Sequence, residues 1–342
     1  MSVYADQLKA SITKYCAKIG TDPLLVQGAG GNVSWKDKDT LWVKVSGTWL
    51  ADAMEKDIFV PVDLQHLRLA LGSGNFAVTP MVLGESALKP SIETLLHALM
   101  AHRVVVHLHA IEALAYLVRS DWQTDFQSRL DASIRWTSVG YKKPGADLAE
   151  AVSLALQGAS GANVIFLQNH GVVVGEEDIA EVEQVLNDMT VALNTPPIYH
   201  PDKLSSLVPV SYEGKALYYP ITDSDIHQLA TKIDLFNRLE SGWALYPDHV
   251  VFLGAHPHTY NDMEALDRAL CNIDETPQLI FIKGVGAFTK QDFSSAKNAQ
   301  LRCYYDVLVR QNQEHVIQTL TPQQIGELLN WDAEQYRMGL AK

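Results

Sequence analysis

Short apolar runs rich in β-branched residues alternate along the chain with segments of helical hydrophobic period. The runs at residues 104–110 and 163–167 are too short for helices and are predicted to be buried strands. Apolar residues recur at helical spacing over 3–19, 146–158 and 178–194. Strands and helices that alternate with short turns between them predict a layered α/β domain.

A proline-rich stretch interrupts this alternation. Residues 196–214 contain four prolines, which predicts a linker. We therefore expect a domain over 1–195 and a second α/β domain over 215–342. In the second domain, the apolar runs at 249–253 and 278–282 are predicted to be strands. The helices predicted there span 224–241, 261–272, 293–312 and 322–337.

Parts of the second domain repeat parts of the first. Asn163–Asp178 aligns with Gln278–Asp292, and Arg103–Ala110 aligns with His249–Ala255. Chance similarity between two βα units is one explanation, but three histidines inside these segments are lost together, which favours a degenerate copy. The lost residues are His107, His109 and His170, replaced by Phe252, Gly254 and Val285.

The charge balance excludes one class of partner. The chain has 342 residues, with 27 Lys and Arg against 40 Asp and Glu, for a formal net charge of −13. So acidic a surface is a poor match for a nucleic-acid backbone, and we expect no nucleic-acid partner. A small anionic substrate remains compatible, because a bound metal or a local basic pocket can override the global field.

The sequence predicts a cytoplasmic protein with no membrane partner. It contains no run of about 18 apolar residues, and its first residues lack the apolar core of a signal peptide. The cysteines Cys16, Cys271 and Cys303 are far apart, so they form neither a disulfide framework nor a metal knuckle. Free thiols fit a reducing compartment.

Two histidines in one predicted strand are the strongest chemical signal. Residues i and i+2 of a strand point to the same face, so the imidazoles of His107 and His109 converge. Two imidazoles are half of a tetrahedral zinc site. His170 follows the strand at 163–167, where α/β sheets carry their sites, and is the candidate third ligand. A structural or exposed histidine is the alternative, and the second pair, His256 and His258, lies in a proline-containing loop and is expected to be solvent-exposed.

An acidic residue and a glycine cluster complete the candidate set. Glu93 lies in the first turn of a helix with a predicted cap at Ser91, and it is either an acid/base group or a complement to the helix dipole. The stretch Gly28–Ser34 and the pair Ser46-Gly47 are either anion cradles or plain hairpin turns.

Taken together, these motifs resemble the class II aldolase/adducin-head family. The resemblance rests on their order and spacing, and it covers nearly the whole chain. The PSIET form and a second half that ends in GVGAFT are most similar to the aldolase half of bifunctional rhamnulose-phosphate aldolase/lactaldehyde dehydrogenases. The motifs are Gly30-Gly31-Asn32-x-Ser34, Ser46-Gly47, Pro90–Thr94, His107-x-His109 and Asn169-His170-Gly171.

The resemblance implies a three-layer α/β/α fold with a central, mainly antiparallel sheet, whereas the alternation of strands and helices alone suggests a parallel one. It implies a divalent metal, usually zinc, held by His107, His109 and His170. Glu93 is then the catalytic acid/base. The residues implied to bind the phosphate of a ketose phosphate are Gly31, Asn32, Ser46, Gly47 and Ser91.

The implied activity is that of a metal-dependent lyase that cleaves a ketose phosphate or a related hydroxy-carbonyl compound. The cleavage is a retro-aldol reaction through a metal-bound enediolate. A sugar-phosphate 4-epimerase, dehydratase or decarboxylase is the alternative at the same site. A non-catalytic, adducin-like binding module without the histidines is an alternative of another class.

Two departures from the family pattern leave the need for a phosphate open. Leu108 lies between the strand histidines, where several relatives have threonine, and Ile92 stands where many have a second phosphate-binding serine. The resemblance also implies a homo-oligomer, either a tetramer or a dimer, that acts on a small sugar. We expect the second half to be catalytically silent and to serve packing, subunit contact or pocket closure.

Overall fold

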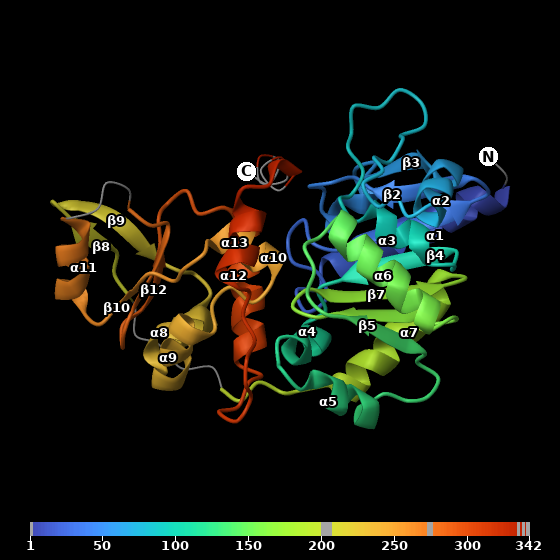
Figure 1. The fold of residues 1–342 in the computed structure, drawn as a ribbon. Coiled ribbons are helices and arrows are strands. Elements are labelled where there is room, and N and C mark those ends of the chain that lie inside the picture. The colour runs from blue at the N-terminus through green and yellow to red at the C-terminus, as the bar shows by residue number, and fades with distance from the viewer. Residues whose placement is uncertain (1–2, 200–206, 272–275, 334–335, 337–338, 340–342) are drawn as a thin grey trace.

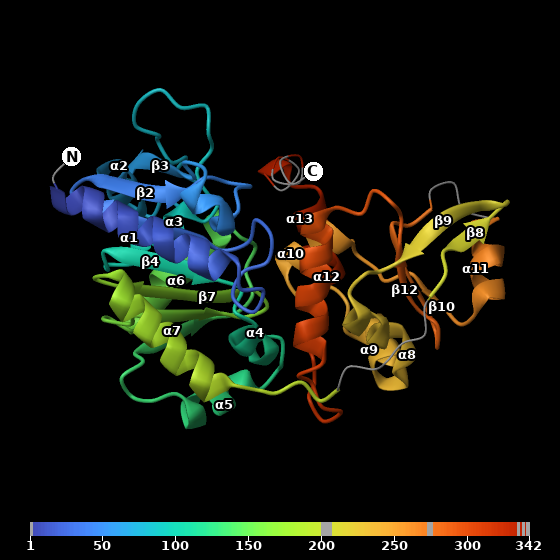
Figure 2. The same ribbon diagram turned by 180° about the vertical axis from the view of Figure 1, so that it is seen from behind.

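Two β-sheets, one in each half of the chain, organise the part of the protein that the structure describes (Figure 1). Figures 1 and 2 show each sheet in its own lobe, with α10 (Pro247–Leu253), α12 (Ser295–Leu308) and α13 (Pro322–Leu329) between the lobes. The structure is a computed structural model, and it describes residues 3–199, 207–271, 276–333, 336 and 339.

The first sheet has seven strands within the described residues, in the order β3-β2-β1-β4-β7-β6-β5. Every neighbouring pair is antiparallel except β5 and β6, which are parallel. This confirms the mainly antiparallel sheet that the resemblance implied. The strands are β1 (Asn32–Asp37), β2 (Thr40–Lys44), β3 (Phe59–Asp63), β4 (Val104–Leu108), β5 (Trp136–Val139), β6 (Val164–Leu167) and β7 (Gly171–Glu176).

Helices cover both faces of this sheet and make three layers. Helices α1 and α7 pack on one face, and α2, α3 and α6 pack on the other (Figures 1 and 2). The bounds are α1 (Val3–Gly20), η1 (Leu50–Met54), α2 (Leu64–Gly72), α3 (Thr94–Leu99), α4 (Ile111–Leu117), α5 (Trp122–Arg129), α6 (Ala146–Gly158) and α7 (Ile179–Leu193).

The central strand β4 is buried along its whole length. Val104, Val106 and Leu108 pack in the core beneath α1 and α7, whereas Val105 joins the core beneath α2, α3 and α6. Because side chains alternate along a strand, His107 lies on the same face as Val105. This alternation directs His107 toward the start of α3.

The second sheet has five strands in the part of the chain that is described, in the order β10-β11-β12-β9-β8. Its pairing repeats that of β5-β6-β7-β4-β1, because in both runs the first pair is parallel and the next three pairs are antiparallel. In both halves a helix joins the first two strands and another follows the third. The second half is therefore a degenerate α/β copy of the first. Its strands are β8 (Val210–Tyr212), β9 (Lys215–Pro220), β10 (Thr259–Tyr260), β11 (Leu279–Ile282) and β12 (Gly286–Thr289).

One strand predicted in the second half is wrong, because His249–Leu253 lies in the helix α10. Pro247 occupies the start of this helix, a position that proline favours. A short apolar run that is buried on all sides cannot be assigned to a strand or a helix from periodicity alone.

The counterpart of β4 in the second half is β9. His107 pairs with Val173 of β7, and Pro220 pairs with Phe288 at the matching place of β12. Pro220, rather than Phe252, therefore stands where the first half has His107.

Other boundaries also differ from the prediction. The segment expected as a linker contains β8, which pairs with β9 and thus belongs to the second sheet. Residues 200–206 of that segment lie outside the described residues, as do parts of the predicted helix at 322–337. The domain boundaries stay a prediction. The helix predicted at 224–241 is divided into η2 (Ser224–His227), α8 (Gln228–Thr231) and α9 (Ile233–Ser241), and α11 spans Met263–Leu270.

Buried polar contacts join the two halves. The Arg310 guanidinium Nη2 lies 3.1 Å from Glu112 Oε1 on α4, and both side chains are almost fully buried. Arg119 Nε donates a hydrogen bond to Gln311 Oε1 at 2.9 Å. No helix in the described ranges has the length and apolar composition needed to cross a bilayer.

Replacing Glu112 tests how far the halves depend on one another. Glu112→Gln deprives Arg310 of its nearer carboxylate partner and leaves Asp306 at 3.9 Å. Breaking a buried ion pair costs about 3 kcal/mol. We expect a lower midpoint of thermal unfolding, measured by circular dichroism. The control is Glu264→Gln, which breaks an exposed pair with Arg268 and should leave the midpoint nearly unchanged. Equal midpoints for the two variants would contradict a stabilising contact between the halves.

Candidate active site

Three histidines from two loops and a strand lie together at one end of β4. His107 is in β4, His109 follows its last residue, and His170 lies in the turn between β6 and β7. One ring nitrogen of each lies within 4.8 Å of those of the other two, and all three side chains are buried. The structure thus brings together the three histidines that the sequence singled out.

A glycine lets these rings approach one another. Gly171, the first residue of β7, faces the end of β4. A Cβ atom at Gly171 would lie 2.4 Å from the Leu108 carbonyl oxygen and 3.1 to 3.2 Å from ring carbons of His109 and His107. No larger side chain fits there without moving the strand that carries the histidines.

Burial favours the neutral form of two of these rings, His107 and His109. His107 Nδ1 donates a hydrogen bond to the Val172 carbonyl oxygen at 3.0 Å, which leaves Nε2 with the lone pair. Burial lowers the pKa of His107, although the nearby Glu93 opposes it, and burial lowers the pKa of His109 to about 3. Neutral imidazole is the form that binds metal ions.

One buried nitrogen of the cluster is left without a hydrogen bond. His107 Nε2, which lies 3.4 Å from Glu93 Oε2, has no hydrogen-bond partner among the described residues. Unpaired polar atoms in a protein interior are costly unless a ligand or ion satisfies them. Three imidazoles beside a carboxylate are a donor set that fits a divalent cation such as Zn²⁺.

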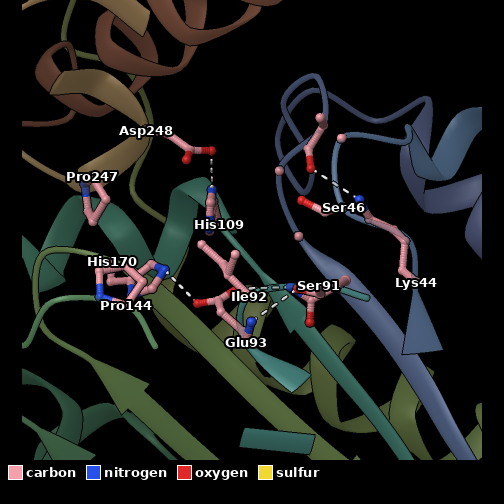
Figure 3. Close-up of a pocket in the computed structure, with 15 residues that line it drawn as sticks. Lys44, Ser46, Ser91, Ile92, Glu93, His109, Pro144, His170, Pro247 and Asp248 are labelled. Atoms are coloured by element: carbon pink, nitrogen blue, oxygen red, sulfur yellow. Dashed lines mark hydrogen bonds and ion pairs between the residues drawn. The ribbon is translucent and has the colours of Figure 1, made fainter. Parts of the chain in front are cut away.

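Glu93 faces this cluster from the start of α3. Its Oε1 lies 3.1 Å from His170 Nε2 (Figure 3). Its Oε2 lies 3.4 Å from His107 Nε2. Burial alone would raise the pKa of the Glu93 carboxyl, but His107 and His170 outweigh it and hold the pKa well below its usual range. Glu93 is therefore an ionised carboxylate inside the protein.

Glu93 occupies the N-cap position of α3 instead of its first turn, because the regular helix begins at Thr94. Its side chain makes no capping hydrogen bond. Ser91 Oγ accepts a hydrogen bond from the Glu93 backbone N–H at 3.3 Å, as the predicted cap would, but residues 91–93 form a separate turn. This turn directs the carboxylate toward the histidines rather than along the helix axis.

A buried chain of hydrogen bonds orients the carboxylate. Asn32 Nδ2 donates to Glu93 Oε2 at 2.9 Å, and Asn32 Oδ1 is hydrogen-bonded to His97 Nε2. Ser34 Oγ lies 2.7 Å from His97 Nδ1. Burial lowers the pKa of His97 to about 3, so the ring stays neutral. The sequence analysis missed His97, although its position one turn after Glu93 on the same helix was a usable signal.

Glu93, His109 and His170 line a pocket (Figure 3), and His107 is not part of its lining. Gly31 and Gly47 have φ values of 65° and 79°, which favour glycine. All five residues predicted to bind a phosphate line the same pocket as Glu93, the candidate acid/base. The predicted residues in the lining are Gly31, Asn32, Ser46, Gly47 and Ser91, and the others include Lys44, Ile92, Pro144, Pro247 and Asp248.

The sequence analysis missed a buried lysine in the pocket wall. Lys44 ends β2, is only 2% exposed, and lies close to Ser46 in the lining. Its Nζ donates hydrogen bonds to the carbonyl oxygens of Ala29 at 3.1 Å and Thr48 at 2.6 Å. A basic residue between two buried valines of one strand was the signal in the sequence.

The second half of the chain also reaches the pocket. Pro247 and Asp248 come from the start of α10, and Asp248 Oδ2 lies 3.5 Å from His109 Nδ1 (Figure 3). The sequence contained no signal for this contact, because the run after Asp248 was predicted to be a strand of a separate domain.

The close approach at Gly171 can be tested by adding one methyl group. Gly171→Ala should destabilise the protein by about 1–3 kcal/mol, because the new Cβ collides with the Leu108 carbonyl. The measurement is chemical denaturation. Gly158→Ala is the matched control, because a Cβ there meets no described atom within 4 Å. A Gly171 variant as stable as this control would show that the strands have room to separate.

Comparison with known proteins agrees with this geometry. The profile of the "Class II Aldolase and Adducin N-terminal domain" matches residues 10–191, more than half of the chain. A protein of Bacillus subtilis (strain 168) named uncharacterized oxidoreductase YuxG is 27% identical over 197 residues. That match covers 50% of this chain and 28% of the length of YuxG.

Two solved structures resemble the first half. The N-terminal class II aldolase domain of a conserved protein from Thermoplasma acidophilum is 24% identical, with a TM-score of 0.44 over 53% of this chain and 90% of that chain. An L-fuculose 1-phosphate aldolase is 20% identical, with a TM-score of 0.41 over 56% and 84%. Scores this low add nothing to the family assignment, and the closer similarity to bifunctional rhamnulose-phosphate aldolases stays a prediction. On the profile match, the chain belongs to the class II aldolase/adducin family.

Proposed function

We propose that this chain is a metal-dependent aldolase-type lyase that cleaves a ketose phosphate or a related hydroxy-carbonyl compound. One observation carries the proposal. An ionised Glu93 carboxylate lies 3.1 and 3.4 Å from ring nitrogens of His170 and His107, in a pocket whose other wall carries glycines and a buried lysine. The reaction needs a group that transfers a proton at carbon and, beside it, a surface that binds the anionic part of the sugar.

His107, His109 and His170 would hold the metal ion, and we propose Zn²⁺. A divalent cation bound there supplies Lewis-acid polarisation of a substrate carbonyl. The neutral state of the buried rings supports this role, because a protonated imidazole cannot bind a cation.

Glu93 would move the proton. In the direction of carbon–carbon bond formation, its carboxylate removes a proton from the carbon next to the substrate carbonyl. In the direction of cleavage, the same carboxyl group returns that proton. Asn32 supports this role because it binds Oε2 and fixes the plane of the carboxylate.

The opposite wall would bind the anionic group of the substrate. The hydroxyl groups of Ser46 and Ser91 can donate hydrogen bonds, and Lys44 adds a positive charge. Gly31 and Gly47 keep this wall free of side chains, so a phosphate can approach the backbone. Ile92 in the same lining is apolar, so Lys44 is the residue we propose to replace the missing second serine.

We also propose that the enzyme is a cytoplasmic homo-oligomer, either a tetramer or a dimer. The location is supported by Cys16, Cys271 and Cys303, which are all free thiols in the structure.

Substitutions in the cluster should separate metal binding from proton transfer. His107→Ala and His170→Ala should lose bound zinc and turnover together. Glu93→Gln should keep the metal and lose about 10²- to 10⁴-fold in kcat, the range for a general acid/base. Metal is measured by elemental analysis, and products by mass spectrometry. Turnover retained in Glu93→Gln would exclude Glu93 as the base.

The same product analysis separates the reaction classes. A lyase yields two carbonyl fragments from one ketose phosphate, whereas a 4-epimerase leaves the carbon skeleton intact. A dehydratase releases water, and a decarboxylase releases carbon dioxide. Unchanged substrates with a bound metal would overturn the lyase proposal.

Replacing the pocket lysine tests the anion site. Lys44→Met should raise KM for a phosphorylated ketose by about 10- to 100-fold, the cost of one lost charge-assisted hydrogen bond, with a smaller change in kcat. Lys36→Met is the matched control, because Lys36 is also buried, lies on the neighbouring strand β1, and donates to the His102 carbonyl instead. An unchanged KM in Lys44→Met would place the anion elsewhere.

A further inference from the structure

We propose that Asp248, from the second half of the chain, is a positioning residue for the histidine cluster. Its carboxylate holds the ring of His109 in the tautomer with a proton on Nδ1, which leaves the lone pair on Nε2. This inference rests on the metal site proposed above, because it assigns the outer partner of one of its ligands.

The contact is between two buried groups. Asp248 and His109 are 2% and 5% exposed, and Asp248 Oδ2 lies 3.5 Å from His109 Nδ1. A carboxylate oxygen only accepts hydrogen bonds, so a nitrogen lone pair facing it would be repelled. We therefore assign the proton to the nitrogen beside Asp248, because no carbonyl oxygen fixes the proton of His109 in the way that the Val172 carbonyl fixes that of His107.

A closed ring of polar contacts keeps Asp248 in place. Gln300 Nε2 on α12 lies 3.2 Å from Asp248 Oδ2 and 3.4 Å from the Gln27 carbonyl oxygen. Gln27 Nε2 in turn lies 3.4 Å from the His109 carbonyl oxygen. The ring thus passes from His109 through both halves of the chain and back to His109.

The glycine cluster leaves room for this contact. A Cβ atom at Gly30 would lie 2.9 Å from the Gln27 carbonyl oxygen and 3.2 Å from both Asp248 Oδ2 and His109 Nδ1. All three distances are tighter than ordinary packing, so a side chain there would press on the backbone and on these two groups. A glycine at this position therefore serves the His109–Asp248 contact as well as the pocket wall.

The second half of the chain also contacts the turn that carries His170. Asn169 precedes His170 and has a φ of 52°, in the left-handed region. Its Nδ2 donates to the carbonyl oxygens of Leu245 at 2.8 Å and Gln318 at 2.7 Å, both in the second half. Two of the three histidines are thus positioned from outside the domain that carries them.

A carboxylate that accepts from the outer nitrogen of a ligating histidine orients the ring and raises its basicity. Loss of such a partner typically weakens metal binding by about 10- to 100-fold. The second half has no histidine at the places of His107 and His170, yet it would determine the metal affinity of the first half.

The test compares metal binding by the full chain and by the Asp248→Asn variant. Asparagine has the same shape but presents a neutral amide to His109. We expect the dissociation constants of Zn²⁺ and Co²⁺, measured by competition with a chelating dye, to rise by about 10- to 100-fold. The visible spectrum of bound Co²⁺ should change as well, which a merely structural role of Asp248 would not cause.

Glu112→Gln is the control, because it breaks a contact between the halves that includes none of the three histidines, Asp248 or Gln300. It should bind Co²⁺ with wild-type affinity and spectrum, even if it unfolds at lower temperature. If Asp248→Asn does not fold, Gln300→Met replaces it and should weaken Co²⁺ binding several-fold by releasing Asp248. Wild-type affinity and spectrum in the folded variant would overturn the inference.

The two proposals fail separately. A wild-type chain that binds Co²⁺ but cleaves no ketose phosphate would overturn the lyase and leave the role of Asp248 intact. A wild-type chain that binds neither Zn²⁺ nor Co²⁺ would overturn the metal site and the role of Asp248 together.

Discussion

The site depends on the close contact between the end of β4 and the first residue of β7. Because Gly171 has no side chain, the Leu108 carbonyl can lie where a Cβ would be, and the rings of His107 and His109 come within reach of His170. Strand alternation then determines which groups face α3 and which face α1. A shift of one residue between these strands would turn His107 into the opposite core.

The second constraint is electrostatic. An ionised carboxylate inside a protein is costly unless other groups compensate its charge. Around Glu93 the compensation comes from the hydrogen bond donated by Asn32 and from the nearby rings of His107 and His170. A bound cation would compensate the charge of Glu93 and would also give the unpaired His107 Nε2 a partner. The cluster is thus built so that folding brings together groups that are incompletely satisfied by the protein alone, which links cation binding to stability.

Much of the site could be predicted because its signals are local. His107 lies in β4 and His109 directly follows its last residue, and the glycines lie in two short turns next to β1 and β2, so short patterns were enough. Lys44 and Asp248 were missed because their roles depend on which distant segments meet, and Asp248 is 139 residues away from His109 along the chain. The wrong strand at 249–253 has a different cause. This segment is buried on all sides, which removes the periodicity that distinguishes a helix from a strand.

The contact of Asp248 with His109 has a consequence for how the site behaves on dilution. A group supplied by a neighbouring subunit is lost when subunits dissociate, so its contribution falls with protein concentration. Asp248 is covalently joined to the chain that carries His109, and its effective concentration is determined by the tether. The part of the metal affinity that we propose to come from this carboxylate would therefore be the same at nanomolar and at millimolar protein.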